Sequence, residues 1–312
     1  MKLLVFFAVI ALAACGAEGA SIPTGSVAHA AHKTRPNIYF TNYVYVTDSS
    51  GYMYVYAAGA NGSPIDSVAL ANQPGYVATD SGDPARVYLS DGGNSVPIYS
   101  SESAGLNVVG HLKMITNAAA IAADNDTTNT IAVIGGSSGS QYVALYAGGT
   151  GDINPHKTIS QPSIGSASYG LIGVGIAYDD DVFVTAKSGS SYAVFSYGHR
   201  ATSWRTIDSG LTSAKAIFVD TTGPNLYVGE QGNLCEYTAS SNYNTKTCAS
   251  GFTLLNAIHS SFDASTYQAF GAANSLTPGY AKVFPNQFGG SGPPPYIITS
   301  SLSSAQDVDG GE

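Results

Sequence analysis

The chain has 312 residues, of which only 11% are charged, and its formal net charge is −9. Its 12 lysines and arginines form no cluster, and binding to DNA or RNA needs such a cluster to neutralise phosphates, so we expect no nucleic-acid partner. The abundance of Tyr (21) and Gly (36) suits sheets whose exposed faces are polar but uncharged.

Residues 1–14 predict a bacterial lipoprotein signal peptide. Lys2 precedes an apolar run of twelve residues, which is shorter than the roughly 20 that a membrane span needs. The tetrad LAAC at residues 12–15 resembles the lipobox, and this resemblance implies cleavage before Cys15 and lipidation of its sulfur. The alternative is an ordinary secretory signal with an incidental Cys. Gly16 follows where Asp would imply inner-membrane retention, so we expect an exported, lipid-anchored protein of the cell envelope, at the outer membrane, facing the periplasm or the surface.

Residues 15–36 predict a flexible tether that starts at the lipidated cysteine. The stretch has no hydrophobic period and is rich in Gly, Ala, Ser and His. A linker of this length reaches roughly 25 Å. His29 and His32 could hold a metal, but they have no Cys or carboxylate neighbours, so we expect a solvated linker and no metal site.

From residue 37 onward the chain consists of copies of one unit. Each copy has an apolar strand that ends in Asp, then a polar turn, then two further apolar strands. A period of about 20 to 50 residues is typical of repeat folds such as propellers. The Asp residues that end the first strands are 44, 55, 41, 43 and 46 residues apart, and they are Asp80, Asp124, Asp179, Asp220, Asp263 and Asp309.

The two ends of the chain complete one unit between them. The C-terminal AQDVD supplies only a first strand, whereas VYVTD (residues 44–48) and YMYVYA (52–57) supply a second and a third without a first. Pairing the ends would remove the exposed sheet edges of an open array. We therefore predict an all-β fold over residues 37–312, a six-bladed β-propeller of four-stranded antiparallel blades closed by pairing of its N- and C-terminal strands.

The repeated Asp residues have two interpretations. They could form a ring of calcium ligands, or each could cap the turn after its strand by accepting backbone N–H groups. Because a single site would not need six equivalent residues, turn capping is the favoured interpretation.

Two irregular stretches depart from the repeat. The 55-residue interval implies an insertion of about 11 residues within residues 148–170. Long loops on rigid scaffolds are frequent binding sites, although a neutral surface insertion is the plainer alternative. The prolines of GGSGPPPY (289–296) cannot donate ladder hydrogen bonds, which predicts an exposed edge position.

With Cys15 assigned to lipid, Cys235 and Cys248 remain. The repeat places them on the third and fourth strands of one blade, which are neighbours. In an exported protein such a pair predicts a disulfide, worth on the order of 3 kcal/mol in the chain-entropy model. The alternative is two buried free thiols.

Catalysis in a propeller usually takes place at the central channel, which the innermost strands line. Those strands offer one histidine, His259, and one Asp outside the repeated set, Asp307. They could form a general-base pair because their blades are adjacent, but a polar lining that only contacts water is the plainer interpretation. No GxSxG, HExxH or phosphate-loop pattern is present, so we name no catalytic residue, metal ligand or cofactor.

The units PGYVATD…VYLSD…PIY and AIFVD…NLYVGE…LCEY resemble the NHL and YVTN families of β-propeller repeats. The resemblance covers nearly the whole mature chain, and lipobox-bearing propellers of this kind are similar to many bacterial lipoproteins. Its motif is structural and implies no family active site. Sugar-lactone hydrolases and peptidyl-glycine lyases share the architecture, so the fold alone does not exclude an enzyme.

Two functions follow from these observations. The first is a membrane-anchored, non-catalytic scaffold that binds a protein, peptide or glycan, favoured by inner strands poor in ligating side chains. The second is a metal-dependent hydrolase or lyase of the six-bladed type with its site at the central channel. The sequence favours the first.

Overall fold

A computed structural model gives the structure of the chain. It describes residues 43–57, 62–72, 75–80, 85–124, 129–219, 225–230, 232–250, 255–263, 266–273, 280–285, 296–298, 302 and 305–311, and it describes no side chains at 104, 249–298, 310 and 311. The predicted signal peptide, Cys15 and the tether lie outside these residues, as do residues 289–295. None of the helices in the described ranges has the length and apolar character needed to cross a bilayer.

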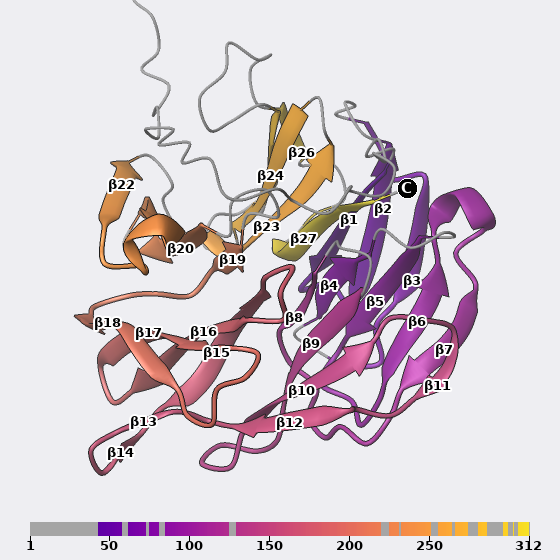
Figure 1. The fold of residues 1–312 in the computed structure, drawn as a ribbon. Helices are drawn as coiled ribbons and strands as arrows, with labels where there is room; N and C mark the ends of the chain where they lie inside the picture. Colours follow the sequence, from indigo (N-terminus) through magenta and orange to yellow (C-terminus); the bar gives the residue numbers. More distant parts are fainter. Residues whose placement is uncertain are drawn as a thin grey trace, which may run out of the picture.

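The described chain consists mainly of antiparallel sheets, and each large sheet is named here by its innermost strand (Figure 1). The β27 sheet holds β27 (Ala305–Gly311), β1 (Tyr43–Asp48), β2 (Tyr52–Ala57) and β3 (Asp66–Ala69). The β4 sheet holds β4 (Tyr76–Thr79), β5 (Arg86–Ser90), β6 (Val96–Ser100), β7 (Val108–Leu112) and β11 (Gly151–Ile153). The β8 sheet holds β8 (Ile121–Ala123), β9 (Thr130–Gly135), β10 (Tyr142–Ala147) and β12 (Lys157–Ser160).

The second half of the chain continues the pattern. The β15 sheet holds β15 (Gly170–Ile176), β16 (Val182–Ser188), β17 (Ser191–Tyr197) and β18 (Arg205–Leu211). The β19 sheet holds β19 (Ile217–Val219), β20 (Leu226–Glu230), β21 (Asn233–Tyr237) and β22 (Lys246–Ser250). The β23 sheet holds β23 (Leu255–Asp263), β24 (Thr266–Ala273), β25 (Tyr280–Pro285) and β26 (Tyr296–Ile298). Smaller elements are the hairpin β13 (Ser163–Ile164) and β14 (Ala167–Ser168), and the 3-10 turns η1 (Glu102–Ala104) and η2 (Ala239–Ser241).

The sheets are arranged as a propeller. Each innermost strand contacts the innermost strand of the next sheet, in the order β27, β4, β8, β15, β19, β23 and back to β27. Figure 1 shows the sheets spread around this common centre. The all-β, repeat-based prediction is therefore confirmed.

The ends of the chain pair as the sequence predicts. β27 runs antiparallel to β1, with Asp309 opposite Tyr45 and Val308 opposite Val46, and the register shifts between Thr47 and Asp48. This pairing gives the N-terminal sheet its innermost strand. No sheet of the described residues closes on itself into a barrel.

The prediction of six uniform four-stranded blades is wrong in one respect. The described residues form five four-stranded sheets, one five-stranded sheet and one two-stranded hairpin. The fifth strand of the β4 sheet is β11, which comes from the predicted insertion and lies parallel to β7, with Gly151 opposite Gly110. A Cβ atom at Gly110 would lie 2.1 Å from the carbonyl oxygen of Gly151, so only glycine permits this approach.

The core lies between neighbouring sheets. Strand residues alternate between the two faces of a sheet, and both faces are covered, so the second strands are buried along nearly their whole length. At one interface Tyr45, Met53 and Val55 pack against Val77 and Leu89 of the next sheet. Burial on both faces explains why these strands are nearly continuous apolar runs.

Hydroxyl groups join successive sheets at one repeated position. On the second strand of its sheet, Thr47 Oγ1 donates to the Gly75 carbonyl at 2.6 Å and Thr185 Oγ1 donates to the Lys215 carbonyl at 3.0 Å. Ser90 Oγ donates in the same way to the Ala119 carbonyl. Each acceptor precedes the innermost strand of the next sheet. A short hydroxyl side chain therefore makes the same kind of contact between neighbouring sheets three times.

Removal of residues 304–312 tests the closure. Without β27, β1 would expose its backbone groups, and β4 and β23 would each lose a neighbour. We expect the truncated protein to aggregate or to lose its cooperative thermal unfolding, measured by circular dichroism and gel filtration. A truncated protein that stays monodisperse and melts like the full chain would contradict the closure.

Candidate functional site

The carboxylates of β27 bond to the backbone of the neighbouring innermost strand. Asp307 Oδ2 accepts the Val77 N–H at 2.8 Å, and Asp309 Oδ2 accepts the Thr79 N–H at 2.7 Å and the Thr79 hydroxyl at 3.1 Å. Asp307 is 0% exposed and Asp309 5%. Two residues apart on a strand, they face the same way, and their amide partners on β4 are also two residues apart. These inner-strand carboxylates therefore have an architectural role.

The proposed pair of His259 and Asp307 is only partly described. His259 lies on β23 opposite Phe270, and β23 contacts β27, so the two residues belong to neighbouring innermost strands as predicted. The His259 side chain lies outside the described side chains, and the general-base pairing stays a prediction. In the structure, Asp307 Oδ2 accepts a hydrogen bond from the Val77 N–H.

Turn capping by the repeated Asp residues is confirmed at two positions. Asp80 Oδ1 accepts the Arg86 N–H at 3.0 Å, and Asp124 Oδ1 accepts the Thr130 N–H at 2.6 Å. Each bond spans the turn into the second strand. Asp220 and the side chain of Asp263 lie outside the described residues. Asp309 differs, because its carboxylate bonds to the next sheet.

The equivalence of Asp179 to the other repeated Asp residues is wrong. In the β4 sheet the Asp80 N–H donates to the Arg86 carbonyl, and at the same place in the β15 sheet the Ala177 N–H donates to the Asp181 carbonyl. Ala177 is thus the structural counterpart, and the turn is two residues shorter. Asp179 lies exposed in that turn, where it accepts the Asp181 N–H at 3.3 Å.

Within the described ranges, no group of three or more His, Cys, Asp or Glu residues could hold a metal ion.

Asp80 also anchors a buried polar cluster. Arg86 Nε lies 2.7 Å from Asp80 Oδ2, and the Tyr88 hydroxyl donates to the same oxygen at 2.7 Å. Burial raises the pKa of Tyr88, and the neighbouring Asp80 raises it further, so the phenol stays protonated. The cluster fixes the first turn of the β4 sheet.

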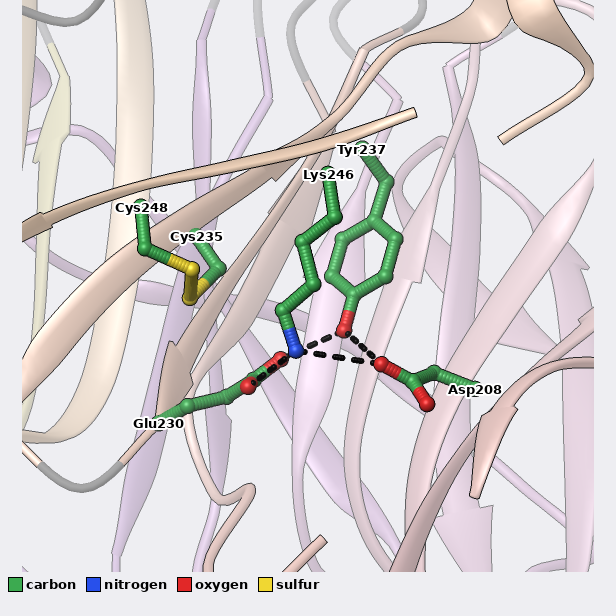
Figure 2. The surroundings of a disulfide bond; sticks show 6 residues. All are labelled: Asp208, Glu230, Cys235, Tyr237, Lys246 and Cys248. Atoms are coloured by element: carbon green, nitrogen blue, oxygen red, sulfur yellow. Dashed lines mark hydrogen bonds and ion pairs between the residues drawn. A yellow bond between two sulfur atoms is a disulfide. The ribbon is translucent and has the colours of Figure 1, made fainter. Parts of the chain in front are cut away.

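The predicted disulfide joins Cys235 on β21 to Cys248 on β22 (Figure 2). The two residues lie directly opposite each other, with their Cα atoms 4.0 Å apart. Cys235 is buried, whereas Cys248 is exposed on the outermost strand. The disulfide therefore fastens an edge strand to its sheet.

Next to the disulfide lies a cluster of four polar side chains, called here the Lys246 cluster: Asp208, Glu230, Tyr237 and Lys246. Lys246 Nζ lies 2.6 Å from Glu230 Oε2 and 3.0 Å from Asp208 Oδ2. The Tyr237 hydroxyl is bonded to Glu230 Oε1 at 2.5 Å and to Asp208 Oδ2 at 2.8 Å. Figure 2 shows the Lys246 nitrogen between the two carboxyl groups. Asp208 comes from the β15 sheet and the other three residues from the β19 sheet.

The ionisation of the Lys246 cluster follows from its contacts. Partial burial raises the pKa of Asp208, but the hydrogen bonds from Tyr237 and Lys246 outweigh burial and hold it below the ordinary 3.8. Burial lowers the pKa of Lys246, but the bonds to Glu230 and Asp208 outweigh it, and the pKa lies above 10.5. Burial and both carboxylates raise the pKa of Tyr237. Lys246 and Asp208 are thus an ion pair, and Tyr237 is a protonated phenol.

Sequence reasoning missed this cluster, although one signal pointed to part of it. Once Cys235 is paired with Cys248, antiparallel counting places Tyr237 opposite Lys246 on the same face. The contribution of Asp208 comes from another sheet, and no sequence pattern predicts it.

The insertion within residues 148–170 forms ordered structure. Beside the regular strand β12 it contains β11 and the hairpin of β13 and β14, in which Ser163 pairs with Ser168. After the hairpin the chain enters β15, where the side chain of Gln141 bonds to both the N–H and the carbonyl of Leu171. Whether the insertion binds a ligand stays a prediction.

No protein-family model and no curated protein sequence matches the chain. Among solved structures it is similar to a functionally unknown protein from Desulfotomaculum acetoxidans DSM 771, with a TM-score of 0.57 and 11% identity over 86% of this chain and 99% of that chain. It also matches the dihydro-heme d1 dehydrogenase NirN, with a TM-score of 0.45 and 13% identity over 86% of this chain and 56% of that chain. The first likeness concerns the fold alone, and the second carries no argument about this chain. Membership of the NHL or YVTN families stays a prediction.

Replacement of Asp307 by alanine tests the role of the β27 carboxylates. The Val77 N–H would lose the buried acceptor that Asp307 provides, so we expect the free energy of unfolding to fall by about 1–3 kcal/mol in urea titrations. Asp152→Ala, at an exposed carboxylate, is the control and should change stability by less than about 0.5 kcal/mol. A variant at Asp307 as stable as the parent would indicate that this carboxylate serves something other than the fold.

Proposed function

We propose that the chain is an exported six-bladed β-propeller, in which the five-stranded sheet counts as one blade, that acts as a non-catalytic binding scaffold at the cell envelope. Its partner would be a protein, peptide or glycan, and Cys15 would carry the lipid that tethers it to the membrane.

The scaffold proposal rests on the hydrogen bonds that Asp307 and Asp309 make. They are buried carboxylates on an innermost strand, where a propeller enzyme would place its catalytic groups. Both accept backbone hydrogen bonds from β4. Groups committed in this way to holding two strands together are poorly suited to taking up a metal or a substrate proton, which favours a rigid scaffold over a hydrolase or lyase.

The disulfide supports export. Disulfides form and persist mainly in oxidising compartments outside the cytoplasm. A bond on an outermost strand with Cys248 exposed would meet the reducing agents of the cytoplasm directly. The lipid anchor rests on the sequence around Cys15.

Metal removal tests the scaffold against the enzyme alternative. A scaffold held by its own hydrogen bonds should contain no stoichiometric calcium or zinc, and a chelator should leave its melting temperature unchanged. Elemental analysis of the purified mature protein and melting with and without chelator give the two readings. One tightly bound ion per chain, with a lower melting temperature after its removal, would favour the metal-dependent hydrolase or lyase.

Replacement of Cys15 by serine tests the anchor. One acyl chain gives only marginal membrane binding, at about 0.8 kcal/mol per buried methylene, whereas two or more hold a protein stably. We expect the wild type, expressed in a bacterial host, to fractionate with membranes and to carry acyl mass, and Cys15→Ser to lose both. Equal solubility and the same N-terminus for the two proteins would show a freely secreted protein.

A further inference from the structure

The Lys246 cluster brings an amine and a carboxyl group from two different sheets into contact. Lys246 Nζ lies 3.0 Å from Asp208 Oδ2, and the side chains are 29% and 28% exposed. This contact places the amine nitrogen beside the carboxyl group whose carbon, Cγ, it would attack. β22 carries Lys246 on the edge of the β19 sheet, and β18 carries Asp208 on the edge of the β15 sheet. A bond between them would join two neighbouring sheets covalently.

Each reactant is bonded to one of the other two members of the cluster. Glu230 Oε2 accepts a hydrogen bond from Lys246 at 2.6 Å. The Tyr237 hydroxyl lies 2.5 Å from Glu230 Oε1 and 2.8 Å from Asp208 Oδ2, and its single hydrogen can be donated to either oxygen. A carboxylate on the amine can take up its proton, and a phenol on the carboxyl oxygen can stabilise that oxygen as it leaves. Glu230 is only 9% exposed, so water competes little for it.

We propose that Lys246 and Asp208 condense into an intramolecular isopeptide bond, with Glu230 as the proton acceptor and Tyr237 as the hydrogen-bond donor to the departing oxygen. One ammonium hydrogen passes directly to Asp208 Oδ2, which leaves a neutral amine beside a carboxylic acid. The Lys246 nitrogen then forms a bond to the Asp208 Cγ, and Glu230 takes a second hydrogen from it. Glu230 delivers that hydrogen to Oδ2, the Cγ–Oδ2 bond breaks, and water leaves. The third hydrogen remains on the amide nitrogen.

The fold supplies what the two side chains lack in solution. Well-oriented intramolecular reactions reach effective concentrations on the order of 10⁵ M or more, which favours condensation over hydrolysis. The orientation depends on the position of β22. This strand is held in register by its hydrogen bonds with β21 and by the Cys235–Cys248 disulfide. The disulfide, two residues from Lys246, therefore prepares the position of the amine. Burial keeps Tyr237 protonated and able to donate.

The ionic resting state reaches the reactive form without binding or releasing a proton. The ion pair and the neutral pair hold the same number of protons, so their ratio does not change with pH while Asp208 and Lys246 keep these states. Contacts within the cluster widen that range, because they hold the pKa of Asp208 below 3.8 and the pKa of Lys246 above 10.5.

Mass spectrometry of the reduced and alkylated full chain tests the proposal. Wild type and Lys246→Arg are prepared in parallel, so that processing of the N-terminus cancels in the comparison. We expect the measured mass of the wild type to lie below the mass calculated from its sequence by one water molecule. The measured mass of Lys246→Arg should equal its calculated mass. A protease digest should contain one cross-linked peptide that joins the segments around Asp208 and Lys246.

Two further variants and a control assign the roles. Asp208→Ala should carry its full mass, and Glu230→Gln, which keeps both reactants, should carry its full mass or form the bond many times more slowly. Lys113→Arg is the matched control, because Lys113 is paired with Asp152 at 3.5 Å and, among the described residues, no second carboxylate is bonded to this amine and no phenol to this carboxyl group. It should retain the deficit. Thermal melting shows which variants remain folded.

Two results would overturn the proposal. One is a wild type at its full mass after prolonged incubation of the folded protein. The other is a deficit that persists in folded Lys246→Arg or Asp208→Ala, which would place the loss of water elsewhere in the chain. Neither result depends on whether the protein is a scaffold or an enzyme.

Discussion

The pairing of β27 with β1 is the constraint on which the ring depends. The two strands come from opposite ends of the described chain, and their ladder runs from Tyr43 opposite Gly311 to Asp48 opposite Ala305. β27 also lies against β4 and β23. The strand is therefore the inner member of one sheet and the neighbour of two others. Bonds from Asp307 and Asp309 to β4 add a second contact of a different kind, from side chain to backbone.

In a closed ring the outermost strand of each sheet still has an unpaired edge that could pair with another molecule. In this protein several of these edges are protected. β18 carries two register shifts and Asp208, whose side chain bonds within the interface between sheets. β22 is fastened by the disulfide and by Lys246. The outer edge of β7 is covered by β11. Bulges, charges and covering strands are the devices by which natural sheets avoid pairing with other molecules.

The sequence predicted what depends on local pattern. Apolar runs that alternate with polar turns are typical of short antiparallel strands. This pattern predicted the period of the repeat, the strand order and the completion of one sheet by both ends of the chain. The disulfide followed from the place of two cysteines in the repeat. Asp80 and Asp124 cap their turns because a carboxylate at a strand end has backbone amides within reach.

The features that sequence reasoning missed depend on contacts between sheets. β11 pairs with another sheet through the close approach of Gly110 and Gly151, which no local pattern predicts. The repeat pattern predicts Asp179 as a strand-end position, but the turn in the β15 sheet is shorter, so Ala177 is the counterpart. The Lys246 cluster needs Asp208 from a second sheet, and its geometry appears only when the two sheets pack side by side.

Native-state amide hydrogen exchange tests the central claim most directly, because it reports the free energy of opening strand by strand. If the closing strand belongs to one cooperative ring, the slowest amides of β1 and those of Val77 and Thr79 should open with the same free energy as the amides of β9, which lies in another sheet. Exchange of β1 and β4 at a much lower free energy, while β9 stays protected, would show that the ends of the chain detach on their own and that closure does not hold the ring together.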